Sequence, residues 1–111
     1  YGPIPCARSL TQAEIDSDYE KSTGTVIVET FNDRHIDPMN LPAVICRNHG
    51  PFTWGSDPAS AVYHAVVLEE VAKMAFFTRQ IGCSLEPAPQ RILDKHFLRK
   101  HGPNAYYGQK K

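Results

Sequence analysis

The sequence predicts an α/β fold in which helices pack on a small sheet. Residues 43–46 are four consecutive apolar residues, which is typical of a buried strand because no polar face is left. The Asp57-Pro58 pair then indicates a helix start, with Asp57 as N-cap and Pro58 in the first turn. A long, mostly apolar stretch follows as far as Ile81. With 111 residues, the chain fits one domain with a small core.

A first helix is predicted near the N-terminus. Thr11 and Glu14 have the spacing of a capping box, in which each side chain bonds the other's backbone amide. Leu10 and Ile15 stand where a hydrophobic staple would lie. We expect this helix to continue to about Ser22.

Residues 25–31 are ambiguous. Their β-branched composition weakly favours a strand. Yet Thr23, Val26 and Phe31, with their neighbours at positions 27 and 30, also repeat with the spacing of one helical face. Residues 32–40 are predicted to form a polar, exposed loop.

His49 directly follows the predicted strand, on a turn that Gly50 and Pro51 force. In open α/β sheets, ligands and metals are held at the ends of such strands. A single histidine at a strand end is more often structural. His49 is therefore a candidate that needs support from the rest of the chain.

The helix predicted over residues 57–81 is expected to be buried over much of its circumference. Three charged residues fall together in one sector: Glu69, Glu70 and Lys73. The other sectors are largely apolar. His64 lies away from the charged sector, and we interpret it as a buried, hydrogen-bonded structural residue. Gly82 is expected to end the helix in the left-handed conformation.

The C-terminal part predicts a stiff connector at residues 86–89 and a last helix at residues 89–101. Its apolar face contains Ile92, Leu93 and Phe97. In the tail that follows, two adjacent tyrosines at positions 106 and 107 are hard to bury within the chain. The tail is therefore either disordered or docked on another surface.

Composition excludes some classes of function. Twelve basic and twelve acidic residues cancel, which gives no electrostatic case for nucleic acid or for an anionic membrane surface. No apolar run approaches the roughly 18 residues of a membrane span. Cys6, Cys46 and Cys83 have no Cys-x-x-Cys spacing, and we interpret them as reduced thiols of a cytoplasmic protein, two of them in the core. The chain begins at Tyr1 without a methionine, and we expect it to be a fragment.

Four blocks resemble the class II aldolase/adducin family, and within it the C-terminal half of the pentulose-phosphate 4-epimerases. They are residues 2–8, 23–31, 49–55 with 61–70, and 94–102 with 105–109. The His-Gly-x-x-x-x-Gly turn that begins at His49 is shared with the aldolases of the family. The Lys-His-Gly-x-x-Ala-Tyr-Tyr-Gly-Gln ending is much more particular to the epimerases.

This resemblance implies a three-layer α/β/α fold around a mixed sheet. Residues 1–111 would be the C-terminal part of one such domain, which usually assembles as a cyclic homotetramer. It also implies that residues 23–31 form a helix. We adopt the helix, because the helical face noted above agrees with it.

The resemblance further implies metal-assisted cleavage of a carbon–carbon bond. A divalent metal, typically Zn²⁺, would be held by three histidines, one of them His49 and the other two outside this chain. A phosphorylated pentulose, L-ribulose 5-phosphate, would be cleaved between carbons three and four and rejoined on the other face, giving D-xylulose 5-phosphate. The metal would act as a Lewis acid and keep an open position for the substrate.

The family's catalytic tyrosine matches Tyr107, delivered from a neighbouring subunit, where a phenol can exchange a proton with the hydroxyl at carbon four. His96 matches a further histidine near the active site. Arg99 is a candidate for the substrate phosphate, and Glu20 matches a carboxylate to which we assign little catalytic weight. Tyr106 is expected to pack.

The chain contains no His-x-His pair and no phosphate-binding loop rich in Gly and Ser. Because one histidine cannot hold a catalytic zinc, the chain alone is expected to be inactive. Two alternatives remain open: a class II sugar-phosphate aldolase, and a non-catalytic interaction domain like the adducin heads.

Overall fold

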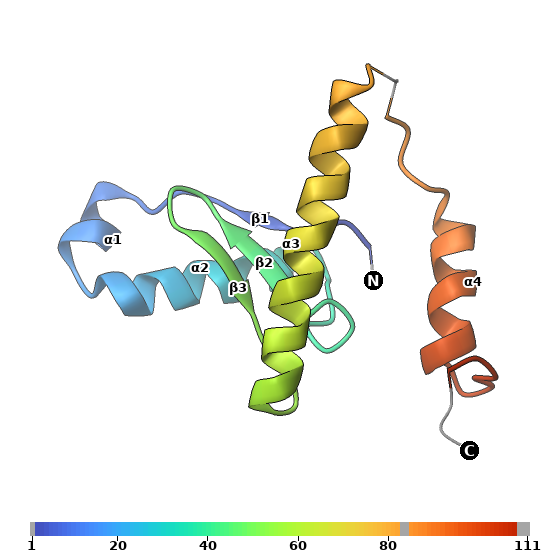
Figure 1. Cartoon of the computed structure of the whole chain (residues 1–111). Helices are drawn as coiled ribbons and strands as arrows, with labels where there is room; N and C mark the ends of the chain where they lie inside the picture. The colour runs from blue at the N-terminus through green and yellow to red at the C-terminus, as the bar shows by residue number, and fades with distance from the viewer. Residues whose placement is uncertain (1, 83–84, 109–111) are drawn as a thin grey trace.

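The computed structural model describes residues 2–82 and 85–108. Its elements in chain order are β1 (Cys6–Ala7), α1 (Gln12–Asp16), α2 (Tyr19–Asp33), β2 (Ala43–Cys46), β3 (Gly50–Thr53), α3 (Pro58–Gln80) and α4 (Gln90–His101) (Figure 1). The strands form one mixed sheet in the order β1-β2-β3, with β1 parallel and β3 antiparallel to β2. The predicted α/β class and mixed sheet are confirmed.

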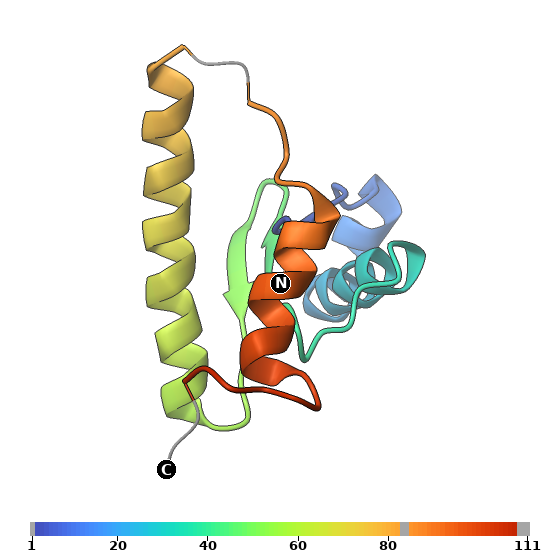
Figure 2. The same cartoon turned by 90° about the vertical axis from the view of Figure 1, so that its right-hand side faces the viewer.

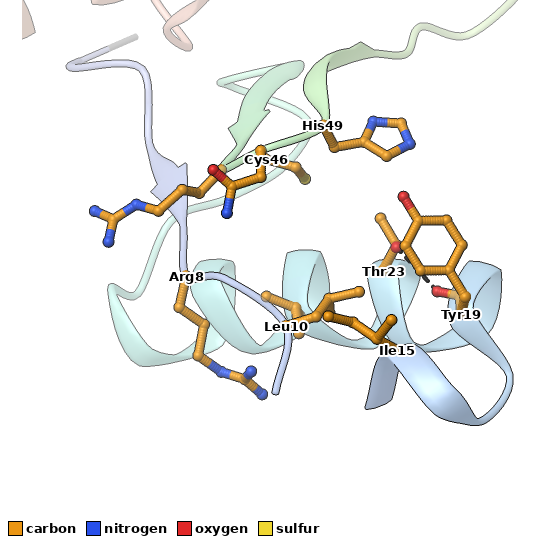
Figure 3. Close-up of a pocket in the computed structure, with 10 residues that line it drawn as sticks. Arg8, Leu10, Ile15, Tyr19, Thr23, Cys46 and His49 are labelled. Carbon is orange, nitrogen blue, oxygen red and sulfur yellow. Dashed lines mark hydrogen bonds between the residues drawn. The ribbon is translucent and has the colours of Figure 1, made fainter. Parts of the chain in front are cut away.

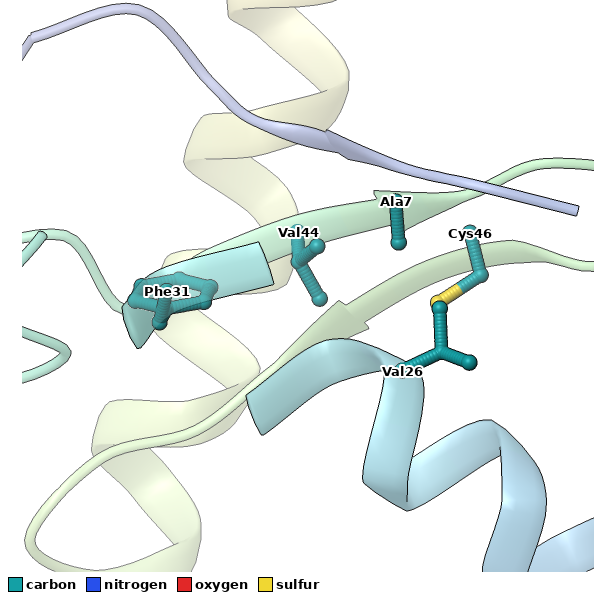
Figure 4. Close-up of a cluster of buried hydrophobic side chains, with 5 residues drawn as sticks. All are labelled: Ala7, Val26, Phe31, Val44 and Cys46. Carbon is teal, nitrogen blue, oxygen red and sulfur yellow. The ribbon is translucent and has the colours of Figure 1, made fainter. Parts of the chain in front are cut away.

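The core lies between α2 and one face of the sheet. Val26 and Phe31 of α2 point at Val44 and Cys46 of β2 and at Ala7 of β1, all of them buried (Figure 4). The sheet alternation sends Val44 and Cys46 to the α2 side, because successive strand residues point to opposite faces. The opposite face receives α3, whose Leu68 is buried there.

The segment that composition assigns to a strand is helical, so the composition-based alternative is wrong and the helix is confirmed. The face at Thr23, Val26, Thr30 and Phe31 is buried against the sheet. The Thr23 and Thr30 hydroxyls donate to the carbonyls of Tyr19 and Val26, at 2.9 and 2.7 Å. Packing of this face therefore outweighs the β-propensity of its residues.

The helix expected over residues 10–22 is two helices. The predicted capping box is present, since Glu14 N donates to Thr11 Oγ1 and Thr11 N donates to Glu14 Oε2. However, α1 ends at Asp16, and Asp18 then caps α2 by accepting from Lys21 N at 3.3 Å. The second cap restarts the chain in a new direction.

Strand β3 is absent from the sequence-based expectation, because Gly50 and Pro51 read as a turn. It lies at the edge of the sheet, where a proline without an N–H is tolerated. The two-residue β1 gives no periodic signal at all.

The start of α3 agrees with the prediction, whereas its environment does not. Asp57 accepts from Ser60 N at 2.8 Å, and hydrogen bonds with Ser60 and Ser56 lower the pKa of its carboxyl. Burial around most of the circumference is wrong: among the described residues of α3, Leu68 alone is buried. The helix meets the sheet along one narrow face, so Val62 and Phe77 stay 65% and 62% exposed.

Helix α4 stands apart from the rest of the described chain (Figure 1). No Cα atom of α4 comes within 8 Å of a Cα of another described helix or strand. Its apolar residues Ile92 and Leu98 are therefore 44% and 51% exposed. Within residues 2–82 and 85–108, no helix has the length and apolar character needed to cross a membrane.

Two further expectations concern Gly82 and the cysteines. Gly82 has a φ of 78° at the end of α3, as predicted. Both described cysteines are free: Cys46 is buried, which raises the pKa of its thiol, and Cys6 is exposed. Cys83 lies outside the described residues, as do Gln109 and the last two lysines.

Candidate active site

His49 lies on the tight turn between β2 and β3. The turn is built by Asn48 and Gly50, whose φ angles of 64° and 136° are in the left-handed region that Asn and Gly tolerate. His49 N donates to Cys46 O at 3.1 Å and closes the turn. The predicted location after the buried strand is confirmed, although β3 separates the turn from α3.

The His49 imidazole is exposed and rests on aromatic neighbours. Its ring stacks on Phe52 with centroids 4.9 Å apart, and the Tyr19 ring lies 6.3 Å away. No described residue forms a hydrogen bond with the ring. Both ring nitrogens are therefore available to a ligand, and the structural role favoured for an isolated strand-end histidine is not seen.

A cavity of about 200 Å³ opens between this turn and helices α1 and α2 (Figure 3). Tyr19 and Thr23 of α2 line one side, and the Tyr19 hydroxyl points towards His49. Arg47 and Asn48 line the other side, and apolar side chains complete the floor. Because Arg8 also lines it, the cavity combines hydrogen-bonding groups and two arginines with an accessible imidazole.

The described residues do not form a metal site by themselves. Within residues 2–82 and 85–108, no group of three or more His, Cys, Asp or Glu side chains could hold an ion. Of the predicted ligands, this chain supplies the single donor His49. A catalytic zinc needs three protein ligands, so any further ligands have to come from elsewhere.

The loop after α4 carries Tyr107, and its course differs from a free tail. Tyr106 N and Tyr107 N both donate to Arg99 O at 3.0 Å. The Tyr107 ring is 52% exposed, and the Arg99 guanidinium lies 4.6 Å from its centroid. The described part of the tail, residues 102–108, is therefore folded against α4. Tyr106 is 71% exposed in this chain, and the expectation that it packs stays a prediction.

Of the remaining candidates, His96 and Glu20 occupy exposed positions. His96 is exposed on α4, beside Phe97. Glu20 is exposed in the first turn of α2. His64 is half-buried, and its Nδ1 lies 2.6 Å from Trp54 O, in agreement with the predicted structural role.

His49 and Tyr107 are not brought together within one copy of the chain. The β2–β3 turn and the end of α4 lie on different sides of the molecule in both views (Figures 1 and 2). None of the cavities described in the structure is lined by both residues.

Comparisons with known proteins identify the family. A sequence model of the Class II Aldolase and Adducin N-terminal domain matches residues 1–76, which is more than half of the chain. The chain belongs to the class II aldolase/adducin family.

Similar proteins in this family carry the name of one enzyme. L-ribulose-5-phosphate 4-epimerase UlaF from Salmonella paratyphi C (strain RKS4594) and its counterpart from Salmonella choleraesuis (strain SC-B67) are each 50% identical over 110 residues. The protein of the same name from Salmonella typhi is 49% identical over 110 residues. Each match covers 99% of this chain and 47% of the relative. The chain thus spans about half the length of these relatives, and the predicted resemblance to the 4-epimerases is confirmed.

Sequence reasoning did not find the side chains that surround His49. Tyr19 opens α2, but its proximity to the turn depends on the break between α1 and α2, which was not predicted. Thr23 was recognised only as part of a helical face. Asn48 did offer a signal, because Asn before His-Gly is typical of a turn with positive φ.

Proposed function

We propose that this chain forms part of a metal-dependent epimerase that converts L-ribulose 5-phosphate to D-xylulose 5-phosphate. The carbon–carbon bond between carbons three and four would break and form again on the opposite face of the aldehyde. The observation that carries the proposal is the accessible His49 imidazole in a family member about 50% identical to proteins named as this epimerase.

His49 would supply one of three protein ligands to a divalent cation, Zn²⁺ or another metal, with the remaining ligands outside this chain. When bound, such a metal supplies Lewis-acid polarisation of substrate oxygens. The chain's own contribution is to hold the imidazole on a rigid turn. Phe52 stacking and the Cys46 carbonyl restrict its orientation.

Tyr107 would exchange a proton with the hydroxyl at carbon four, because a phenol can donate to an oxygen that develops negative charge. Since Tyr107 lies away from His49, we propose that it serves a site on a neighbouring copy in a homotetramer. His96, exposed on α4 before the loop that carries Tyr107, would lie near the phosphorylated aldehyde half of the substrate.

Residues 1–111 would then be the C-terminal part of a single three-layer class II aldolase-type domain. The exposed apolar surfaces of α3 and α4 support this, because large uncovered apolar surfaces mark contacts with other protein. Free cysteines and a phosphorylated sugar substrate are consistent with a cytoplasmic enzyme.

The test expresses the full-length product of the gene and supplies L-ribulose 5-phosphate with Zn²⁺. We expect D-xylulose 5-phosphate as the product, and His49→Ala should lower kcat/KM by about a thousandfold or more, since it removes a metal ligand. His35→Asn is the matched control: it changes another exposed histidine and retains a residue type that tolerates its φ of 54°.

Three outcomes would contradict the proposal. Release of two stable fragments would indicate an aldolase, and absence of any turnover would favour an adducin-like interaction domain. Stoichiometric zinc binding by the 111-residue chain alone, lost in His49→Ala, would show that its ligands lie within this chain.

A further inference from the structure

The loop that carries Tyr107 is anchored to the last turn of α4 by consecutive hydrogen bonds. Gly102 N donates to Leu98 O at 2.8 Å, and Ala105 N donates to Gly102 O at 3.0 Å. The amides of Tyr106 and Tyr107 then converge on the carbonyl of Arg99. These bonds satisfy carbonyls that a helix end otherwise leaves unpaired. The position of Tyr107 is thus set by α4.

Gly102 is required for this return of the chain. Its φ of −77° is open to any residue, but a Cβ there would lie 2.6 Å from Leu98 O and 3.2 Å from Leu98 Cα. Because both are backbone atoms, they cannot move aside as a flexible side chain would. The close approach keeps the loop tight against the helix.

The Tyr107 ring is held by cations from the same helix. The Arg99 guanidinium carbon lies 4.6 Å from the ring centroid, and Lys100 Nζ lies 5.4 Å from it. Both distances are within the range of cation–π interaction. Arg99 therefore contacts Tyr107 twice, through its backbone carbonyl and through its side chain.

The Arg99 side chain is also poorly placed to act through its Nε atom. This atom is buried and has no hydrogen-bond partner among the described residues. A substrate phosphate prefers a guanidinium that presents a fork of N–H donors. The contact that the guanidinium does make is with the face of the tyrosine ring.

From these contacts we infer that Arg99 is a positioning residue that fixes the Tyr107 phenol for proton transfer. This inference rests on the proposed function, in which Tyr107 exchanges the proton at carbon four. Stacking of a planar guanidinium on the ring restricts the side-chain torsions of Tyr107, while the shared carbonyl restricts its backbone. The Tyr107 phenol is thus already oriented when it enters the active site of a neighbouring copy. Holding a catalytic group in its reactive geometry lowers the barrier to reaction.

The test uses the full-length gene product with ring-¹³C-labelled tyrosine, so that Tyr107 is followed by NMR as well as by turnover. Tyr107→Phe assigns the resonance. Arg99→Ala should shift the Tyr107 ring resonance and lower kcat by about tenfold with KM unchanged. Arg99→Lys keeps a cation but loses the planar stack, and should recover part of both signals.

Arg91→Ala is the matched control, because Arg91 is an exposed arginine on the same helix, far from the ring in sequence. It should leave the Tyr107 resonance, kcat and KM unchanged. Should Arg99→Ala fail to fold, Arg99→Lys alone decides the question, through the resonance and through kcat and KM measured separately.

Two results would overturn the inference. An increase in KM with unchanged kcat and an unshifted Tyr107 resonance would make Arg99 a ligand of the substrate. Unchanged kinetics and an unshifted resonance in both Arg99 variants would show that the stack does not position the ring. An inactive gene product whose Tyr107 resonance still responds to Arg99→Ala would contradict the proposed function while the stack itself stands.

Discussion

The sheet with α2 and the pair of helices α3 and α4 bury their apolar side chains to very different extents. Val44 and Phe31 are 0% and 5% exposed in the first region, which we call the body. In the second, Phe77 and Met74 are 62% and 61% exposed, and Ile81 reaches 75%. The body completes a core within this chain. The apolar surfaces of the helical pair are left uncovered by the described residues of this chain, which covers 47% of its relatives.

The largest expected contrast is between two phenylalanines, one from each region. Phe31→Ala should lower the free energy of unfolding by about 3–5 kcal/mol, because it leaves a cavity in the packed core. Phe77→Ala should change it by less than about 0.5 kcal/mol in this chain, because the ring is mostly exposed. Urea unfolding of the 111-residue chain and both variants measures the difference. Equal losses would mean that Phe77 is covered in solution and that the two regions do not differ.

A smaller contrast in stability is expected between substitutions at two glycines. Gly55 lies where the body meets α3, and Gly24 lies on the outer surface of α2. A Cβ at Gly55 would lie 2.5 Å from Ser60 Cβ and 2.8 Å from Ala61 N, so Gly55→Ala should cost about 2 kcal/mol. A Cβ at Gly24, inside α2, meets nothing within 4 Å. Gly24→Ala should therefore stabilise the chain by about 0.5–1 kcal/mol, through helix propensity. Thermal unfolding should move the two midpoints in opposite directions.

The smallest effect concerns acid. Arg8 donates to both Glu14 and Glu29, linking the end of β1 to α1 and α2. Hydrogen bonds from Arg8, and then from the Thr11 amide, lower the pKa of Glu14 from 4.5 to about 2. The link therefore stabilises the body above pH 4.5 and is lost as the pH falls through about 2.

Because the pair is exposed and screened by salt, the effect should be small and should shrink at high ionic strength. The measurement is the urea midpoint between pH 5 and pH 2, with Glu14→Gln as the variant that removes this part of the pH dependence. A variant with an unchanged pH profile would show that the ion pair does not stabilise the body.

Features that depend on local sequence could be predicted, whereas features that depend on packing against distant residues could not. The caps at Thr11 and Asp57 were predicted because their chemistry is local, and they are present. The helix at residues 23–31 was obscured by β-branched residues, whose burial on the sheet is a tertiary effect. The apolar circumference of α3 was predicted to be buried, which assumes that every apolar face finds a partner within the chain. The hydrophobic pattern of the sequence alone does not show which apolar face lacks a partner within the chain.

In the candidate site too, some positions follow from the local sequence and others depend on the tertiary structure. The place of His49 after a buried strand follows from the local pattern of Gly and Pro. The proximity of Tyr19 to His49 depends on how α2 is oriented, which no local pattern determines. For Tyr107, the resemblance supplied the assignment. The anchoring to Arg99 emerged only from the folded loop.

Trp54, the single tryptophan of the sequence, gives the body its own optical reporter. Its indole N–H donates to Pro38 O at 2.8 Å, and its ring meets Phe31 edge-on at 5.4 Å. The intensity and wavelength of its emission should therefore change when the body unfolds. They should not change when α4 moves, because α4 carries no tryptophan. Fluorescence excited at the red edge of absorption can thus report the unfolding of one region, because the tyrosines of the C-terminal loop are not excited there.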